Sequence, residues 1–157
     1  MKIVVQRVQE ASVSVENEVI GAIGNGLSYA MGVAASRPEG KVLLLEGDGG
    51  LIMHIQELET IKRHGLRMVI GAMNDGGFGA ELHKFRSEGL DPSIHMFGRP
   101  DFASIAKSFG LRGSGIVSLD QFGTLLHGYE SAACAEVWNI PISDQVTSLY
   151  QSRQSGH

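Results

Sequence analysis

The chain has 157 residues, of which 43% are hydrophobic and 21 are glycine, and its formal net charge at pH 7 is -4. This length is enough for one globular domain with a core, and the acidic balance gives no electrostatic support for binding a nucleic-acid backbone. A single cysteine excludes an internal disulfide framework, and no apolar run approaches the roughly 20 residues that span a bilayer, so we expect a cytoplasmic protein without membrane or nucleic-acid partners.

The first twenty residues are predicted to be rich in β-structure. Residues 1–8 form an apolar strand-like run, and residues 11–15 alternate small or polar side chains with apolar ones, as a half-buried strand does. A polar turn follows, and Val19 and Ile20 form a short third strand. We therefore expect residues 1–20 to make a β segment distinct from the rest of the chain.

From Gly21 onward the pattern changes to that of an α/β domain. A glycine-rich entry leads into a helix of small residues from about Ser28. Two apolar strands follow, Val42–Leu45 and Met68–Ala72, with an amphipathic helix between them that begins at about Leu51. A strand, helix and strand in this order predict a βαβ unit with parallel strands.

A polar, glycine-rich turn follows each of these two strands. In a βαβ unit the ligand site lies outside the carboxyl ends of the strands, so residues 47–50 and 74–77 should lie side by side. The N–H groups at the start of a helix favour a diphosphate, but Asp48 would repel it unless a divalent cation such as Mg²⁺ lies between them. The alternative at this point is that Asp48 only caps a helix and Asn74 only turns the chain.

The rest of the chain completes one domain. Residues 80–102 lack clean periodicity and predict a long loop with short helical turns. Asp101 should cap a helix that runs to about Phe109, and Cys134 and Trp138 are expected in the core. The remaining elements are a strand at 115–119, a helix at 121–129 and a strand at 135–140. We predict an α/β fold for residues 21–150, a mostly parallel sheet with helices on both faces, and a disordered tail at 151–157.

The spacing within the βαβ unit resembles a known cofactor motif. Gly-Asp-Gly at residues 47–49, followed by 24 residues and Asn74, resembles the thiamine diphosphate motif of the acetolactate synthase and 2-oxoacid decarboxylase superfamily. The stretches GAIGNGLSYAMGVAA, NDGGFGAE and GRPDFASIAKSFGLRG also resemble the diphosphate-binding (PP) domain of that superfamily. The resemblance covers roughly residues 21–142.

This resemblance implies a cofactor, a metal and a set of residues that hold them. The cofactor is thiamine diphosphate with Mg²⁺, and the metal ligands implied are Asp48, Asn74 and the carbonyl of Gly76. The residues implied to bind the cofactor are Ala22, Ile23, Gly24, Gly47, Asp48, Gly49, Gly50, Asn74, Gly76, Gly77 and Phe78.

The resemblance also implies a missing half. In this superfamily the cofactor lies between the PP domain and a pyrimidine-binding (PYR) domain, whose glutamate contacts the aminopyrimidine ring. The chain has no room for that second domain. A thiamine-dependent lyase or transferase acting on 2-oxoacids would therefore need a PYR-domain chain, or a homo-oligomer, and we expect the isolated chain to be inactive.

Residues 1–27 carry a second resemblance, to the N-terminus of D-aminoacyl-tRNA deacylase, a small β-rich dimeric enzyme. That family's active site needs a Ser-Gln-Phe-Thr motif and a Gly-Pro motif, and neither occurs in this chain. One alternative is therefore an inactive chimera joined near Gly21. A working deacylase is a further alternative, which the missing motifs oppose.

Overall fold

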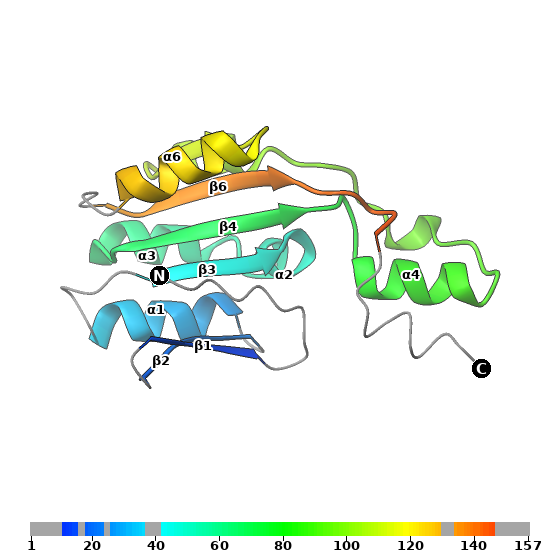
Figure 1. Ribbon diagram of the computed structural model, residues 1–157, viewed down its shortest axis with the longest axis horizontal. Coiled ribbons are helices and arrows are strands. Elements are labelled where there is room, and N and C mark those ends of the chain that lie inside the picture. The colour runs from blue at the N-terminus through cyan, green and yellow to red at the C-terminus, as the bar shows by residue number, and fades with distance from the viewer. Residues whose placement is uncertain (1–10, 16–17, 24–25, 37–41, 130–133, 147–157) are drawn as a thin grey trace.

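A parallel four-stranded sheet forms the centre of the computed structural model, which describes residues 11–15, 18–23, 26–36, 42–129 and 134–146 (Figure 1). The strand order of this sheet is β3-β4-β6-β5, and all three pairings are parallel. Its strands are β3 (Val42–Gly47), β4 (Met68–Asn74), β5 (Arg112–Gly115) and β6 (Glu136–Pro141). The helices are α1 (Gly26–Ser36), α2 (Asp48–Met53), α3 (Glu57–His64), α4 (Gly79–Ser87), α5 (Phe102–Ser108), α6 (Leu119–Tyr129) and the 3₁₀ turn η1 (Ser93–His95).

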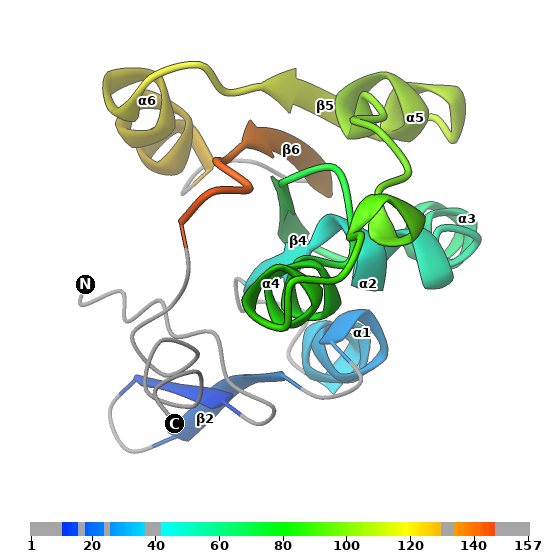
Figure 2. The same ribbon diagram turned by 90° about the vertical axis from the view of Figure 1, so that its right-hand side faces the viewer.

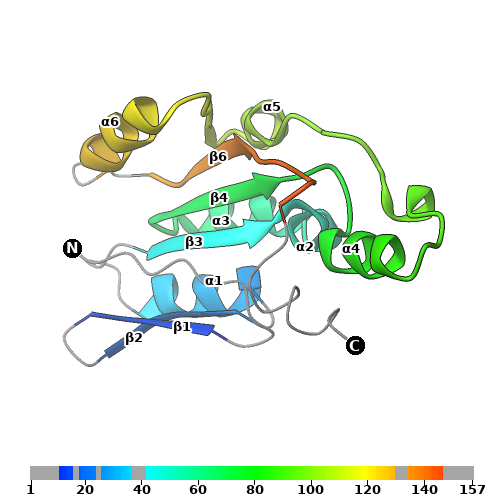
Figure 3. The same cartoon turned by 45° about the vertical axis from the view of Figure 1, so that its right-hand side comes forward.

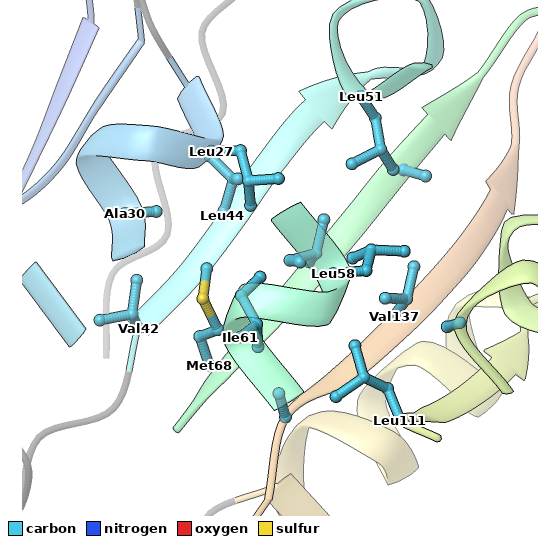
Figure 4. Packing of buried hydrophobic residues seen from close by; sticks show 14 of the residues in the cluster. Leu27, Ala30, Val42, Leu44, Leu51, Leu58, Ile61, Met68, Leu111 and Val137 are labelled. Carbon is cyan, nitrogen blue, oxygen red and sulfur yellow. The ribbon is translucent and has the colours of Figure 1, made fainter. Parts of the chain in front are cut away.

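Helices cover both faces of this sheet because strands β3, β4 and β6 are apolar runs whose successive side chains point to opposite faces. On one face α1, α2, α3 and α5 pack on a cluster that includes Leu44, Ile70 and Val137 (Figures 2 and 4). On the other face α6 packs on a smaller cluster around Val69 and Trp138. Neighbouring residues of one strand thus face opposite layers, and the predicted α/β class with helices on both faces is confirmed.

The N-terminal β segment stands apart from the main sheet. Strands β1 (Ala11–Val15) and β2 (Glu18–Ile23) pair antiparallel as a two-stranded sheet, and β2 lies next to α1. The predicted strand at 11–15 is confirmed. Strand β2 runs across the expected boundary between residues 20 and 21, and the division into segments remains a prediction. Residues 1–8 and the tail 151–157 lie outside the described residues.

Several predicted elements differ from the structure in extent. Residues 48–50, expected as a turn, form the first turn of α2, and the expected single helix is divided into α2 and α3. The expected loop after Gly79 begins with α4, a helix of nine residues. The strand predicted at 115–119 was wrong, because β5 ends at Gly115. Cys134, expected in the core, is exposed.

The helix capped by Asp101 is confirmed. The Asp101 side chain accepts hydrogen bonds from the N–H groups of Ala103 and Ser104 at the start of α5. Trp138 is fully buried, as predicted. Within the described ranges, no helix has the length and hydropathy needed to span a membrane.

Strand β5 gives a test of how closely α5 packs on the sheet. A Cβ atom at Gly113 would overlap the carbonyl oxygen of Ala103 in α5, whereas a Cβ atom at Gly115 in the same strand would meet nothing within 4 Å. We expect Gly113→Ala to lower the free energy of unfolding by about 1–3 kcal/mol, because backbone must move to admit the methyl group. Gly115→Ala is the matched control, and urea denaturation should show almost no change for it. Equal effects of the two substitutions would contradict this packing.

Candidate metal and diphosphate site

The register of the two central strands brings the predicted site residues together. Gly47, the last residue of β3, pairs with Met73 of β4 in the parallel ladder. Asp48 follows Gly47 directly and Asn74 follows Met73, so both side chains begin at the same edge of the sheet. Figure 3 shows β3 and β4 ending on one side of the molecule, with α2 and α4 beyond them. The structure thus places the two predicted turns next to each other.

Asp48 is a buried carboxylate at the first residue of α2. Its side chain is 1% exposed and accepts hydrogen bonds from the N–H of Gly49 at 2.9 Å and from the N–H of Gly76 at 2.7 Å. The second bond connects the turn after β3 with the turn after β4. Each carboxylate oxygen accepts one of these bonds and keeps a lone pair for another partner.

Burial raises the pKa of the Asp48 carboxyl to about 6. Hydrogen bonds from Gly76 and Gly49 oppose this shift, while the neighbouring carboxylate of Asp75, which is also buried, adds to it. Two acidic side chains therefore lie close together away from water, and no cationic side chain among the described residues lowers the pKa of Asp48. A bound divalent cation would favour the ionised form of such a carboxylate.

Asn74 presents a free acceptor at the same edge. Its Nδ2 donates to the carbonyl oxygen of Pro100 at 2.8 Å and to Oδ1 of Asn139 at 2.9 Å. Its Oδ1 is buried and has no hydrogen-bond partner among the described residues. Leaving a buried acceptor unpaired costs about 1–3 kcal/mol. An amide oxygen in this state is a suitable ligand for Mg²⁺, so the residues fit the metal that the sequence implied.

Gly76 fits that metal less directly. Its φ of +86° is in the left-handed region that favours glycine, and this conformation turns its N–H toward Asp48. Its carbonyl oxygen accepts hydrogen bonds from the N–H groups of Phe97 and Gly98, at 3.0 and 3.1 Å. To become a third metal ligand, this oxygen would have to give up its hydrogen bond from Phe97 or from Gly98.

The other predicted cofactor residues surround this pair of turns. Gly49 and Gly50 lie in the first turn of α2, and Gly47 precedes it as the N-cap. The ring of Phe78, at the start of α4, lies against Gly49 and meets the ring of Phe97 edge-on, with centroids 5.3 Å apart. Gly77 is buried beside the carbonyl of His95. Tight packing of the two turns leaves little space for side chains between them.

The residues implied for the aminopyrimidine side lie on the N-terminal hairpin. Ala22 and Ile23 are the last two residues of β2, the element that precedes α1, and Gly24 lies outside the described residues. The first turn of α1 is tied to the end of β3, because the Glu46 carboxylate accepts a hydrogen bond from the N–H of Leu27. The role of Ala22, Ile23 and Gly24 stays a prediction.

Sequence patterns did not identify the residues that support Asn74. Asn139 lies within the apolar run Val137–Ile140, and a polar residue in such a strand is the only signal that it gives. Arg99 donates from Nη1 to the carbonyl oxygens of Asn74 and Ile142, at 2.8 and 2.9 Å. It lies in a loop whose path is not predictable from periodicity.

Comparison with known proteins identifies the family of the chain. The family model described as the thiamine pyrophosphate enzyme C-terminal TPP binding domain matches residues 3–133. The chain belongs to this family. The acetolactate synthase large subunit of Haemophilus influenzae is 34% identical over 108 residues, which are 68% of this chain and 19% of that protein. Isozyme 1 of the large subunit from Escherichia coli is 36% identical over 96 residues, covering 59% and 17% of the two chains.

A solved structure shows the same architecture in a member of the thiamine-dependent enzymes. The thiamine diphosphate-dependent 4-hydroxybenzoylformate decarboxylase of Rhodococcus jostii superimposes with a TM-score of 0.66 at 25% identity, over 75% of this chain and 22% of that one. The chain therefore spans about a fifth of the length of the relatives it matches. The family match begins at residue 3 and so includes most of the deacylase-like segment, and these matches give the deacylase and chimera interpretations no support.

The raised pKa of Asp48 predicts how the stability of the metal-free domain depends on pH. Because this pKa is about 6 in the folded chain and ordinarily 3.8, Asp48 stabilises the fold most when it is protonated. Its contribution is complete below pH 3.8 and is lost as the pH rises through 6. Urea denaturation between pH 4 and 7 should therefore show a steeper decline for the wild type than for Asp48→Asn, which keeps the contribution of Glu46, a carboxyl whose pKa burial also raises. Parallel pH profiles for the two proteins would contradict the buried state of this carboxylate.

Proposed function

We propose that the chain binds thiamine diphosphate together with Mg²⁺, as the PP half of a decarboxylase or carboligase that acts on 2-oxoacids. Membership of the TPP-binding family supports the cofactor. The main support for the metal is the buried Oδ1 of Asn74, which has no hydrogen-bond partner among the described residues and belongs to the sheet edge where Asp48 also lies. If Asn74 only turned the chain, this buried acceptor would stay unpaired at a cost of about 1–3 kcal/mol, which a bound cation would remove.

Asp48 and Asn74 would supply two oxygen ligands to the cation. Mg²⁺ commonly takes one or two protein oxygens and completes its shell with phosphate oxygens and water. The carbonyl of Gly76 is a third ligand if it exchanges the N–H of Phe97 or Gly98 for the metal. The ion would also remove the cost of holding Asp48 next to Asp75.

The glycine turns would hold the diphosphate. N–H groups in the first turn of a helix have no intrahelical partner and attract anions. Gly49 and Gly50 occupy this turn of α2, next to Asp48. The N–H of Gly49 would exchange its hydrogen bond to Asp48 for one to the diphosphate. Gly47, Gly77 and Phe78 would border the diphosphate, and Ala22, Ile23 and Gly24 would line the aminopyrimidine side.

Catalysis would require a second domain that contacts the aminopyrimidine ring of the cofactor. When bound, thiamine diphosphate supplies the stabilised carbanion, and the protein supplies orientation and electrostatics. The residues of this chain described above would orient the diphosphate end, and the Mg²⁺ that they hold would neutralise its charge. The contact to the aminopyrimidine ring would come from a PYR domain, on a separate chain or in an assembly of copies.

Calorimetry tests the site. The wild type should bind thiamine diphosphate when Mg²⁺ is present and lose binding when the metal is removed by a chelator. Asp48→Ala should weaken binding at least about tenfold, or 1.4 kcal/mol, because it removes a charged metal ligand. Asp120→Ala, at an exposed aspartate in the first turn of α6, is the matched control and should bind like the wild type. Equal binding by the wild type and Asp48→Ala would overturn the assignment.

A turnover assay tests whether the chain needs a PYR domain. The purified chain, loaded with thiamine diphosphate and Mg²⁺, should release no carbon dioxide from pyruvate or benzoylformate, because the glutamate of a PYR domain is missing from the aminopyrimidine ring. Adding a separately purified PYR domain that co-elutes with the chain should restore turnover. Thiamine-dependent turnover by the pure chain, at a concentration where sedimentation shows it to be a monomer, would contradict the proposal that it is half of a site.

A further inference from the structure

Two hydrogen bonds hold the side-chain amide of Asn74 in one orientation. Both hydrogens of its Nδ2 are donated, one to the carbonyl oxygen of Pro100 and one to Oδ1 of Asn139. Its Oδ1 is left without a partner in the described part of the chain, although it is buried. The two contacts thus satisfy one end of the amide and leave the other end unpaired among the described residues, on the residue that follows Met73 at the edge where Asp48 lies.

The strand register explains why Asn139 reaches Asn74. Asn139 of β6 pairs with Ala72 of β4 in the parallel ladder, and Asn74 lies two residues beyond Ala72. Side chains two residues apart on a strand lie on the same face, so Asn74 and Asn139 are neighbours on one face of the sheet. This is the face that carries Ile70 and Val137.

The carbonyl of Pro100 determines the orientation of the Asn74 amide. A backbone carbonyl only accepts hydrogen bonds, so the group of Asn74 that faces Pro100, at 2.8 Å, must be its NH₂. Asn139 Oδ1 adds a second acceptor on the same nitrogen. A flipped amide would bring the Asn74 oxygen against two other oxygens.

The backbone of Asn74 is held as well. Its carbonyl oxygen accepts hydrogen bonds from the N–H of Ile142 at 3.0 Å and from Nη1 of Arg99 at 2.8 Å. The same Arg99 nitrogen also donates to the carbonyl of Ile142. The main chain therefore cannot rotate to compensate for a lost side-chain contact, and the amide orientation depends on its two acceptors.

We infer that Asn139 is a positioning residue, which acts through the Asn74 amide to keep Oδ1 directed at the cation. This inference rests on the proposed function, because it concerns the same metal. Asn139 itself is not a ligand in this scheme. A residue that orients a metal ligand typically changes metal affinity by about 10–100-fold when it is removed.

The test measures Mn²⁺ affinity at saturating thiamine diphosphate for the wild type, Asn139→Ala and Asn139→Asp. We expect Asn139→Ala to bind Mn²⁺ about tenfold more weakly, because one acceptor for Nδ2 is lost. Asn139→Asp retains an oxygen at this position and should bind like the wild type. Thermal unfolding midpoints of the metal-free variants serve as the stability control. If Asn139→Ala bound Mn²⁺ weakly only because its fold was destabilised, its midpoint would fall well below that of the wild type. Equal affinities of all three proteins, or equal losses in both variants, would overturn the inference.

A measurement without metal keeps this inference separate from the proposed function. In ¹⁵N NMR spectra of the metal-free protein, both side-chain amide hydrogens of Asn74 should be protected from exchange with water. Asn139→Ala should remove the protection of one of them and leave the other, which faces Pro100. If the wild type binds no Mn²⁺ but shows this pattern, the metal assignment fails and the positioning contact stands. If both hydrogens stay protected in Asn139→Ala, the inference is wrong whatever the metal result.

Discussion

The parallel register of β3 and β4 is the constraint on which the candidate site depends. Because Gly47 pairs with Met73, the residues that follow each strand emerge at one edge and at one level. Asp48 and Asn74 are distant in sequence, but the pairing of β3 with β4 places their backbones side by side. A slip of one residue would reverse the faces of all β4 side chains and bury Met73 in place of Asn74. Core packing and site geometry are therefore set by the same alignment.

Stability and binding conflict at this edge. A buried carboxylate next to a second acidic side chain, and an amide oxygen without a partner, both raise the free energy of the folded chain. The hydrophobic clusters on the two faces of the sheet offset these costs. Strongly perturbed groups that packing alone does not require are typical of functional sites. The local penalty in the chain is thus consistent with selection for a ligand.

The sequence predicts the backbone of the site better than its surroundings. Continuous apolar runs place β3, β4 and β6, and the glycine-rich segments that follow β3 and β4 locate Asp48 and Asn74. Periodicity failed where elements are short or contacts are distant: β5 has only four residues, two of them glycine, and spans 112–115 where a strand at 115–119 was predicted. The support from Asn139 and Arg99 depends on a pairing between β4 and β6 and on a loop path, and neither leaves a local pattern. Long-range register is therefore the information that a single sequence lacks.

The hydrogen bonds around Asn74 join parts of the chain that are far apart in sequence. Pro100 is 26 residues from Asn74, Asn139 is 65 residues away, and the bond from Gly76 to Asp48 spans 28 residues. Closing such long loops has an entropic cost that is recovered only when the packed sheet forms, so this edge should be completed late in folding. A ligand that needs all of these contacts recognises the complete domain and no partly folded form. Its concentration would then shift the unfolding equilibrium of the whole sheet, and the local site would report on global folding.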